Sequence, residues 1–364
     1  MVVVPTLPLG ILCLHCTAGL TVAVLASEPQ ALECSLFAPI MLYSLVEVLT
    51  VMIPMLLSVA FMTVIERKVL AAMQRRVGPN TVGAYGMLQP FADALKLVVK
   101  EVVLPSQAST GVFLLAPLLS LTFSLLGWAV IPFGSGLVLA DLELGLLYTL
   151  AVSSIGVYGI LLAGWSANSK YAFLGSLRSS AQMVSYELIL SSAVLPVVML
   201  TGSFSLTSMV ESQQAVWYVV PLCPLFILFI ISVLAETNRT PFDLPEAESE
   251  LVAGYMTESA GVPFVCFFLA EYCALVLMSA LTATLYLGGY GLPLALANST
   301  FISVEAVALA LKSCLGAFAF VWVRATLPRM RWDSLMSFCW TSMLPLAIAY
   351  VLLVPSILVA FHAT

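Results

Sequence analysis

Long uninterrupted stretches of apolar residues alternate with shorter polar segments along most of the chain. A helix needs about 20 residues to cross the roughly 30 Å hydrocarbon core of a membrane. The stretches are that long, provided that Glu271 is admitted into the sixth of them. The pattern therefore predicts eight transmembrane helices, near residues 38–65, 111–133, 144–167, 188–210, 212–235, 262–287, 301–322 and 334–364.

A weaker apolar run lies at residues 9–27, within an N-terminal apolar extension that we assign to residues 1–35, ahead of a transmembrane domain at 36–364. The run lacks the basic flank of signal and transit peptides. It is either an extra N-terminal helix that spans the membrane or an apolar arm lying against the outer face. Cys13, His15 and Cys16 form a C-x-H-C group, but His362 is the only other histidine. We therefore expect no bound metal.

The composition agrees with a membrane protein. Hydrophobic residues make up 62% of the chain and charged residues 9%, and the mean hydropathy is +1.09. These values exclude an ordinary soluble globular domain. Only helices and closed barrels can span a bilayer, because backbone polar groups must be satisfied internally. Continuous apolar runs favour helices, so the predicted fold class is an all-α polytopic membrane protein.

Lysine and arginine gather in every second loop. The loops near 134–143, 202–215 and 288–300 contain neither residue. Because short positively charged loops stay on the electronegative side of a membrane, this alternation supports eight spans and defines one basic face. The basic residues follow the first, third, fifth and seventh spans: Arg67, Lys68, Arg75, Arg76, Lys96, Lys100, Lys170, Arg178, Arg239, Arg324, Arg329 and Arg331.

The first basic loop contains a candidate amphipathic surface helix at about 86–102. Leu88, Phe91 and Leu95 recur at helical spacing on one face, and Asp93 and Lys96 lie on the other. This is the pattern of a helix lying along a membrane surface. The helix either anchors the chain at the interface or lines the mouth of a site for a lipid-soluble ligand.

The segment 235–258, AETNRTPFDLPEAESELVAGYMTE, concentrates acidic residues in an otherwise acid-poor chain. Charges beside a membrane core are costly unless they are paired, hydrated or used. The segment therefore predicts a hydrated, proton-exchanging site, although a solvated helix start favoured by the helix dipole remains the alternative. Its six carboxylates belong to Glu236, Asp243, Glu246, Glu248, Glu250 and Glu258.

Further acidic residues fall inside the predicted spans. Glu271 lies about nine residues into the sixth span, roughly 14 Å deep at 1.5 Å per residue. A carboxyl group there is expected to be neutral unless water or a cation reaches it. Glu187 and Glu236 have the same character. Glu47, Glu305 and Lys312 also lie inside spans, where an internal salt bridge or a polar contact within the bundle would explain them equally well.

Five blocks of sequence resemble one known family, the first membrane subunit of respiratory complex I, the proton-pumping NADH:quinone oxidoreductase, whose bacterial counterpart is the H subunit. The longest block is ERKVLAAMQRRVGPNTVGAYGMLQPFADALKLVVKE, residues 66–101. The others are GSLRSSAQMVSYEL (175–188), AETNRTPFDLPEAESELVAGYMTE (235–258), FFLAEY (267–272) and WVRATLPRMRWDSLM (322–336). The resemblance covers roughly residues 38–360, with the blocks in the family's order. It departs from the family in the N-terminal extension and at ESAG, from Glu258, where an aromatic residue usually follows the glutamate.

The resemblance implies a bundle of eight tilted transmembrane helices with amphipathic surface helices, forming much of a quinone-access chamber. It implies ubiquinone as substrate and no redox centre in this chain, with NADH, FMN and iron–sulfur clusters bound by partner subunits. Its implied partners are the other membrane-arm subunits, the hydrophilic quinone-module subunits on the basic face, and lipid, with no nucleic acid. The implied chamber residues are Glu66, Arg67, Gln74, Arg76, Asp93, Phe264 and Arg324.

The resemblance also suggests that buried acids couple quinone reduction to proton translocation. We expect a proton-responsive path with Asp93 as its entry group. Its other members would be Glu187, Glu236, Glu246, Glu248, Glu250 and Glu271.

Two alternatives from other functional classes remain at this stage. One is the membrane subunit of an energy-converting hydrogenase or formate hydrogenlyase complex, and the other is a secondary proton-coupled transporter. Transporters usually show internal repeats and broken helices, and the chain has no convincing repeat. The expected location is the mitochondrial inner membrane as a multi-pass protein, with a bacterial plasma membrane as the alternative.

Overall fold

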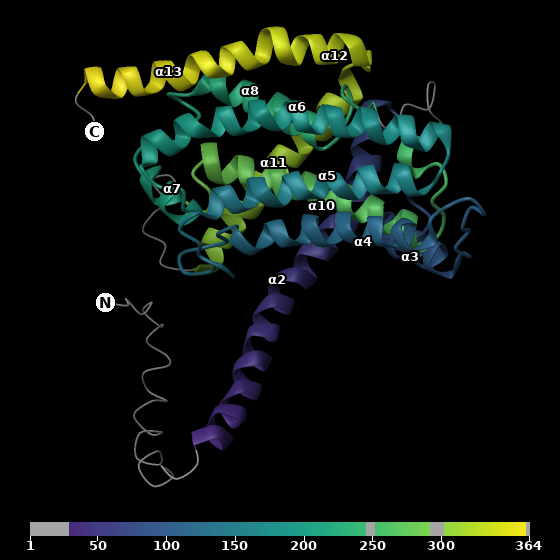
Figure 1. Ribbon diagram of the computed structural model, residues 1–364. Helices are drawn as coiled ribbons and strands as arrows, with labels where there is room; N and C mark the ends of the chain where they lie inside the picture. The colour runs from purple at the N-terminus through teal and green to yellow at the C-terminus, as the bar shows by residue number, and fades with distance from the viewer. Residues whose placement is uncertain (1–28, 245–251, 292–301, 362–364) are drawn as a thin grey trace. The chain divides into compact units, whose positions relative to one another are not determined.

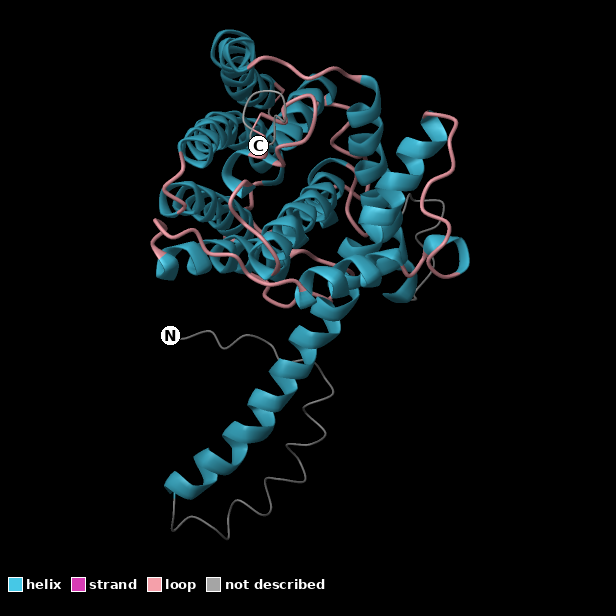
Figure 2. Ribbon diagram, turned by 90° about the vertical axis from the view of Figure 1, so that its right-hand side faces the viewer, coloured by secondary structure: helices cyan, strands magenta, loops and turns pink. Residues whose placement is uncertain are grey.

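The computed structural model describes residues 29–244, 252–291 and 302–361 (Figure 1). Within these ranges the elements are helices, and no strand occurs (Figure 2). This confirms the all-α prediction for the described residues. The possible extra helix at 9–27 and the Cys13–Cys16 group lie outside them, so these two expectations stay predictions.

The chain divides into two compact units, Met1–Met55 and Leu56–Thr364. The described part of the first unit is a single long helix, α2 (Pro29–Met73), which continues into the second unit. The candidate site lies entirely in the second unit. The other helices of that unit are α3 (Gln89–Val99), α4 (Thr110–Leu126), α5 (Gly145–Ser166), α6 (Lys170–Thr201), α7 (Leu206–Ser212), α8 (Cys223–Glu236), α10 (Val262–Tyr286), α11 (Ile302–Thr326), α12 (Trp332–Phe338) and α13 (Leu344–Ala360).

Short helical turns complete these elements. The 3₁₀ turns are η1 (Ala84–Gly86), η2 (Gly127–Val130) and η3 (Gly254–Met256), and a π-helical turn, η4 (Cys339–Met343), joins α12 to α13. Two ends of α6 show why it starts and stops where it does. The Ser169 hydroxyl accepts a hydrogen bond from the Ala172 N–H, and Gly202 ends the helix in the left-handed conformation, with φ of 69°.

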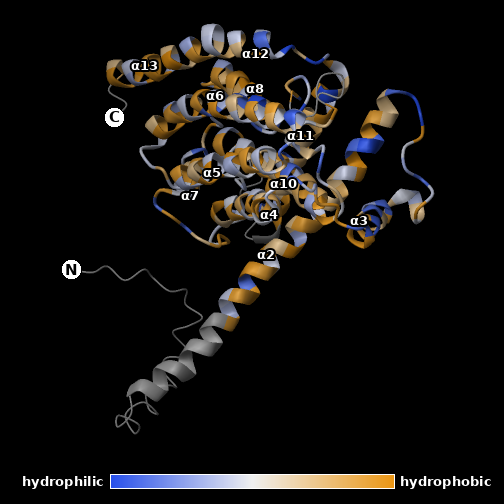
Figure 3. Ribbon diagram, turned by 45° about the vertical axis from the view of Figure 1, so that its right-hand side comes forward, coloured by the Kyte–Doolittle hydropathy of each residue, from blue (hydrophilic) through white to orange (hydrophobic). Residues whose placement is uncertain are grey.

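Seven helices in the described part of the chain are long and apolar enough to cross a membrane. They cover Leu42–Met73, Thr110–Val130, Gly145–Ser166, Lys170–Thr201, Val262–Tyr286, Val304–Thr326 and Trp332–Ala360. The fifth predicted span instead forms α8, which has 14 residues and is therefore only about 21 Å long. Hydropathy colouring shows mostly apolar ribbons in these helices, with blue segments concentrated in connections (Figure 3).

The fourth span begins earlier than the sequence predicted. The apolar run suggested 188–210, but α6 starts at Lys170 and ends at Thr201. The reason is that polar residues in its first half, including Ser176, Ser179 and Gln182, are buried against neighbouring helices. A helix can carry such residues when protein covers them, and a hydropathy window cannot see that covering. Glu187 consequently lies in the middle of the helix rather than just inside its start.

The helices of the second unit pack against one another around a common interior. α4 packs against both α5 and α10, α6 contacts α5, α8 and α13, and α10 also contacts α11 (Figure 1). Small residues allow two of these close approaches: a Cβ at Gly159 would lie 3.0 Å from the Ser120 backbone nitrogen, and one at Gly164 would overlap Ser176. The interior is filled by large side chains such as Tyr186, Phe229 and Tyr286.

The predicted surface helix is present as α3, with shorter bounds than 86–102. Pro90 stands in its first turn, a position that proline tolerates because the first helical N–H groups have no helical acceptor. Leu95 and Val98 are exposed, and the Phe91 ring meets Phe61 of α2 edge-on at 6.1 Å. Its exposed apolar side chains agree with an interfacial position, which stays a prediction.

Candidate functional site

A buried ionic cluster surrounds Glu66, near the end of α2. Arg239 Nη1 donates hydrogen bonds to both carboxylate oxygens of Glu66, at 3.0 and 3.2 Å. Arg324, near the end of α11, donates to the same carboxylate, and the Tyr272 hydroxyl donates to Glu66 Oε2 at 2.6 Å. The Glu66 side chain is only 3% exposed. Two guanidinium groups and a hydroxyl therefore balance this charge in a dry environment.

Arg239 connects that cluster to Glu271 of α10. Its Nε lies 3.0 Å from Glu271 Oε1, an ion pair without hydrogen-bond alignment, and its guanidinium carbon lies 4.3 Å from the centre of the Tyr272 ring. Burial by itself would lower the pKa of Arg239, but Glu271, Tyr272 and Glu66 raise it overall. Arg239 therefore stays charged at physiological pH. Arg239 thus provides the positive charge that the sequence predicted beside a buried Glu271.

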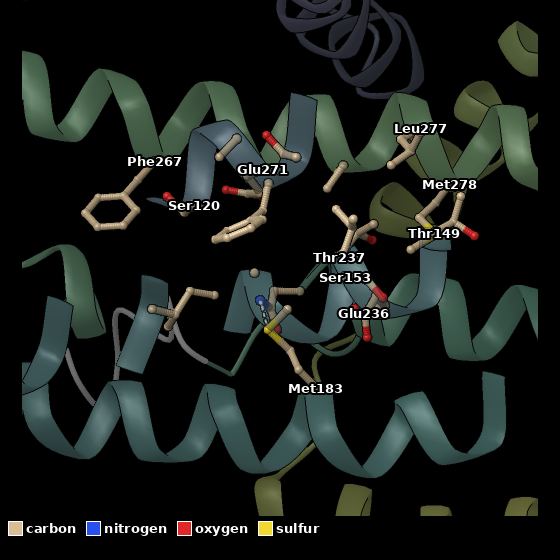
Figure 4. Close-up of a pocket in the computed structure, with 18 of the residues that line it drawn as sticks. Ser120, Thr149, Ser153, Met183, Glu236, Thr237, Phe267, Glu271, Leu277 and Met278 are labelled. Atoms are coloured by element: carbon tan, nitrogen blue, oxygen red, sulfur yellow. Dashed lines mark hydrogen bonds between the residues drawn. The ribbon is translucent and has the colours of Figure 1, made fainter. Parts of the chain in front are cut away.

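A cavity of about 110 Å³ opens beside this ionic cluster. It is large enough for several water molecules, since one needs roughly 10–15 Å³. Figure 4 shows Glu236 and Glu271 among the side chains that line it, approaching from different elements. Most of the lining is apolar, but hydroxyl groups from α4 and α5 interrupt it. These hydroxyls belong to Ser120, Ser124, Thr149 and Ser153.

Glu236 is the last residue of α8 and is 7% exposed. Its Oε2 atom has no hydrogen-bond partner among the described residues. The next two residues, Thr237 and Asn238, also line the cavity, and Asn238 Nδ2 donates to Met183 Sδ at 3.7 Å (Figure 4). A buried carboxyl oxygen without a protein partner beside a cavity of this size is a natural place for bound water.

Glu187 continues the series of acids away from the cavity. It accepts a hydrogen bond from the Ser154 hydroxyl of α5, and its carboxyl group is close enough to Glu236 for the two to interact electrostatically. The structure thus brings together Glu66 and Arg324 around Arg239, joins Glu271 to them, and places Glu236 and Glu187 next along the same interior.

The other predicted chamber residues lie nearer the surface. Arg67 Nη1 pairs with Asp93 Oδ2 at 2.8 Å, with side chains 49% and 39% exposed. Gln74 Oε1 accepts a hydrogen bond from Arg76 Nε at 2.7 Å. Phe264 packs against the buried cluster that contains Met183 and Phe267. Arg67 follows Glu66 directly in the sequence, so α2 carries one residue to the buried cluster and the next to the surface pair.

Three predicted members of the acidic path, Glu246, Glu248 and Glu250, lie outside the described residues, and their placement stays a prediction. Glu305 and Lys312 do not pair with each other in the described part of the structure. Glu305 accepts hydrogen bonds from the Ser135 N–H and hydroxyl, and Lys312 donates to the carbonyls of Gly289 and Gly291, both at 2.7 Å. Glu47 belongs to the first unit.

Sequence reasoning missed several contributing residues. Tyr272 follows Glu271 directly, and an aromatic hydroxyl beside a buried acid was the available indication of a hydrogen bond. Gln182 lies five residues before Glu187 in a mostly small and apolar stretch. Its side chain donates hydrogen bonds to the carbonyls of Ala235 and Phe242, and nothing in the sequence indicated these acceptors. The cavity hydroxyls of α4 and α5 gave no indication at all, because serine and threonine in apolar helices usually bond to their own backbone, as Ser153 does here to Leu150.

Comparison with known proteins identifies the family. The family model described as NADH dehydrogenase matches residues 46–355. NADH-ubiquinone oxidoreductase chain 1 of Mycosarcoma maydis is 67% identical over 322 residues, covering 88% of this chain and 97% of the relative. The chain of the same name from Neurospora crassa is 52% identical, covering 90% and 98%. The H subunit of NADH-quinone oxidoreductase from Rhodospirillum centenum is 52% identical, covering 86% and 94%.

These matches extend over nearly the full length of each relative, and the matched region contains the ionic cluster and every acid lining the cavity. The resemblance inferred from the five sequence blocks is therefore confirmed. The chain belongs to the NADH dehydrogenase family that includes NADH-ubiquinone oxidoreductase chain 1 and its bacterial counterpart, the H subunit of NADH-quinone oxidoreductase.

Proposed function

We propose that this chain is the core membrane subunit of a proton-pumping NADH:ubiquinone oxidoreductase and that its buried carboxyl groups couple quinone reduction to proton movement. The names of the relatives support the first part. The observation that supports the second is the cavity beside Glu236 and Glu271, with an unpartnered carboxyl oxygen on Glu236. The chain is a multi-pass protein of the mitochondrial inner membrane.

The ionic cluster around Glu66 would form one fixed side of this proton path. Glu66 pairs with both Arg239 and Arg324, so these three charges remain in place while the neighbouring carboxyl groups exchange protons. Glu271 is a member of both environments, because it pairs with Arg239 and also lines the cavity. A change in charge near Arg239 would alter the electrostatic environment of Glu271, and water in the cavity would carry that change to Glu236 and Glu187.

Quinone would enter from the side of α3 and the end of α2. The exposed apolar residues of α3 suit an isoprenoid tail, and the Arg67–Asp93 pair lies at the surface next to the buried cluster. Glu66, Gln74, Arg76, Phe264 and Arg324 would form the chamber beyond it, with Asp93 as the proton entry group. Glu246, Glu248 and Glu250 would extend the acidic path toward the basic face.

The catalytic activity belongs to the assembled enzyme. We place NADH, FMN and the iron–sulfur clusters on partner subunits, and ubiquinone is the substrate that reaches this chain. The other subunits of the enzyme are its partners; membrane-arm subunits would flank the helices, and hydrophilic quinone-module subunits would bind the basic face. A surface arginine such as Arg329 suits the latter contact.

The decisive experiment replaces Glu236 with glutamine in the assembled enzyme. Glutamine keeps the size of the side chain but cannot take up or release a proton. NADH:quinone turnover and proton pumping should fall together by about tenfold or more, since removing a positioned proton-transfer group typically costs 10²–10⁴-fold. NADH oxidation by an artificial electron acceptor should stay unchanged, because that reaction does not use this chain.

The matched control is Glu211→Gln on α7, because Glu211 is exposed and does not line the cavity. It should leave turnover and pumping at the wild-type level. Wild-type quinone turnover in the Glu236→Gln enzyme would contradict the proposed coupling path. A loss of artificial-acceptor activity in step with quinone turnover would show instead that the substitution had reduced the amount of enzyme.

A further inference from the structure

Gln182 of α6 is a fully buried amide, 0% exposed, that reaches across to the segment following α8. Its Nε2 donates hydrogen bonds to the carbonyl oxygens of Ala235 and Phe242, both at 2.9 Å. One side chain therefore fastens both ends of the segment 235–242 to α6.

The residues between these two anchor points carry the chemistry of the candidate site. Glu236 directly follows the first anchor and faces the cavity, and Arg239 lies midway and pairs with both Glu66 and Glu271. Shifting this segment would move the two residues together. Beyond Glu236 the segment contains no helix of its own. Its path is fixed by side-chain contacts together with backbone hydrogen bonds, such as that from the Phe242 N–H to the Arg239 carbonyl at 2.8 Å.

Other contacts also hold the segment, the strongest of them being the ion pairs of Arg239 with Glu66 and Glu271. Tyr186, one helical turn after Gln182, packs its ring against Phe242 with centres 5.8 Å apart. The Met330 N–H donates to the Pro241 carbonyl at 3.0 Å. Asn238 reaches Met183 through a sulfur atom, which is a weak acceptor. Among the side chains that the structure describes, that of Gln182 alone donates hydrogen bonds to carbonyls on both sides of Glu236 and Arg239.

We propose that Gln182 is a positioning residue for the coupling reaction, which fixes Glu236 at the cavity and Arg239 against Glu271 by bridging the ends of segment 235–242. The inference rests on the proposed function of Glu236. Gln182 itself exchanges no proton and touches no quinone. Its effect on turnover passes through the placement of Glu236.

The chain contains a matched control in Gln213, at the end of α7. Gln213 is 1% exposed, and its Nε2 donates to the carbonyls of Met209 and Thr284, both at 3.0 Å. It is thus a buried glutamine amide that joins two helical regions in the same way, but neither carbonyl belongs to the segment 235–242. Its Nε2 also donates to the Leu285 carbonyl at 3.2 Å, and its Oε1 accepts from the N–H groups of Tyr218 and Gly288 at 3.4 and 3.0 Å. Gln213 therefore makes more hydrogen bonds than Gln182, so any general cost of losing buried amide hydrogen bonds should be at least as large at Gln213.

The test compares Gln182→Met with Gln213→Met in the assembled enzyme in native membranes. Methionine has a similar volume and flexibility but donates no hydrogen bond. Quinone turnover, divided by NADH oxidation with an artificial acceptor, should fall about tenfold in Gln182→Met, since an error of 1 Å in placing a catalytic group can cost up to 10²-fold. In Gln213→Met the same ratio should stay at the wild-type value.

Each substitution is also combined with Glu236→Gln. If Gln182 acts through Glu236, the double variant should be no slower than Glu236→Gln alone, because the group being positioned has already been removed. A double loss equal to the product of the single losses would overturn the inference, as would wild-type turnover in Gln182→Met. The single Glu236→Gln variant tests the proposed function separately: if its turnover is normal, the coupling proposal fails regardless of the result at Gln182.

A second variant, Gln182→Glu, decides the matter if Gln182→Met does not assemble. A protonated carboxyl group keeps one donor for the two carbonyls, whereas the ionised form has none and faces two carbonyl oxygens. The normalised turnover of this variant should therefore decline with rising pH more steeply than that of the wild-type enzyme. A pH profile parallel to the wild type would overturn the positioning role.

Discussion

Glu66 and Glu236 are both buried carboxyl groups, 2% and 7% exposed, yet their surroundings differ completely. Glu66 accepts hydrogen bonds from Arg239, Arg324 and Tyr272. Glu236 faces a cavity, with one carboxyl oxygen unpartnered among the described residues and another acid, Glu187, close by. Burial alone therefore says little about what an acidic residue does.

The difference suggests that two neighbouring parts of the interior, the ionic cluster and the cavity, have different roles. Fixed ion pairs hold the ends of α2 and α11 and the middle of α10 against the segment after α8, whereas the carboxyl groups at the cavity lie next to space for water. An ion pair fully enclosed by protein is costly to break. A carboxyl group next to bound water can change protonation at a much lower cost. We propose that the first arrangement stabilises the fold and that the second serves proton exchange.

The largest expected effect, on the amount of assembled enzyme, comes from replacing Glu66 rather than Glu236 with glutamine. Glu66→Gln removes the carboxylate that Arg239 and Arg324 share, although Glu271 stays paired with Arg239. Removing one partner of a buried ion pair typically costs about 3–5 kcal/mol. We expect little assembled enzyme on a native gel, in contrast to a normal amount for Glu236→Gln. Equal amounts of assembled enzyme in the two variants would contradict the proposed difference in role between Glu66 and Glu236.

A smaller effect is expected from Tyr272→Phe. The phenylalanine ring keeps the contact with Arg239 but loses the hydroxyl that donates to Glu66 at 2.6 Å. A hydrogen bond to a charged group contributes about 1.5–3 kcal/mol. The temperature at which quinone turnover is irreversibly lost should decrease, while turnover at low temperature should change little.

Tyr286→Phe is the control for that substitution. The Tyr286 hydroxyl is equally buried but donates to a neutral acceptor, the Ala193 carbonyl, at 3.2 Å. Such a bond contributes only about 0.5–1.5 kcal/mol, so the inactivation temperature should decrease less. The reverse order of the two variants would mean that the Glu66 cluster is not the stabilising element that its contacts indicate.

The smallest effect on stability is expected from Arg67→Ala. The Arg67–Asp93 pair is 49% and 39% exposed, and exposed pairs contribute about 0.2–1 kcal/mol. Assembly should stay normal, so an increase in KM for quinone would report on the proposed chamber rather than on folding. Arg331→Ala removes a comparable exposed pair with Asp333 and should leave that KM unchanged. An unchanged KM in Arg67→Ala would remove this pair from the chamber.

Much of the fold could be read from the hydrophobic pattern. The helical class was predicted correctly, and α4, α5, α10 and α11 lie close to the predicted runs. Two predicted spans differ from the helices that the structure shows. Polar residues such as Gln182 extend α6 far beyond its apolar run because other helices cover them, and hydropathy cannot distinguish covered polar residues from exposed ones. The apolar run before Glu236 predicted a full span but includes only 14 helical residues.

The candidate site was predicted as a set of residue types but not as an arrangement. Glu271 was expected to need a cation or water, and that partner is Arg239, which lies in a loop well before it in the sequence. The sequence placed Arg239 on the basic face of the membrane but offered no reason to choose it over the other arginines on that face. Tyr272 and Gln182 were missed because the groups that they bind lie on other elements.

The sequence by itself determined that this chain crosses a membrane as helices, that its basic residues gather in alternate loops, and which family it belongs to, because transfer free energies and local motifs depend on residues close together along the chain. Only the tertiary structure decided which acids are paired and which face a cavity. That distinction depends on the distance between atoms on helices far apart in sequence, such as Glu66 and Arg324, and electrostatic interactions in a buried environment change steeply with that distance.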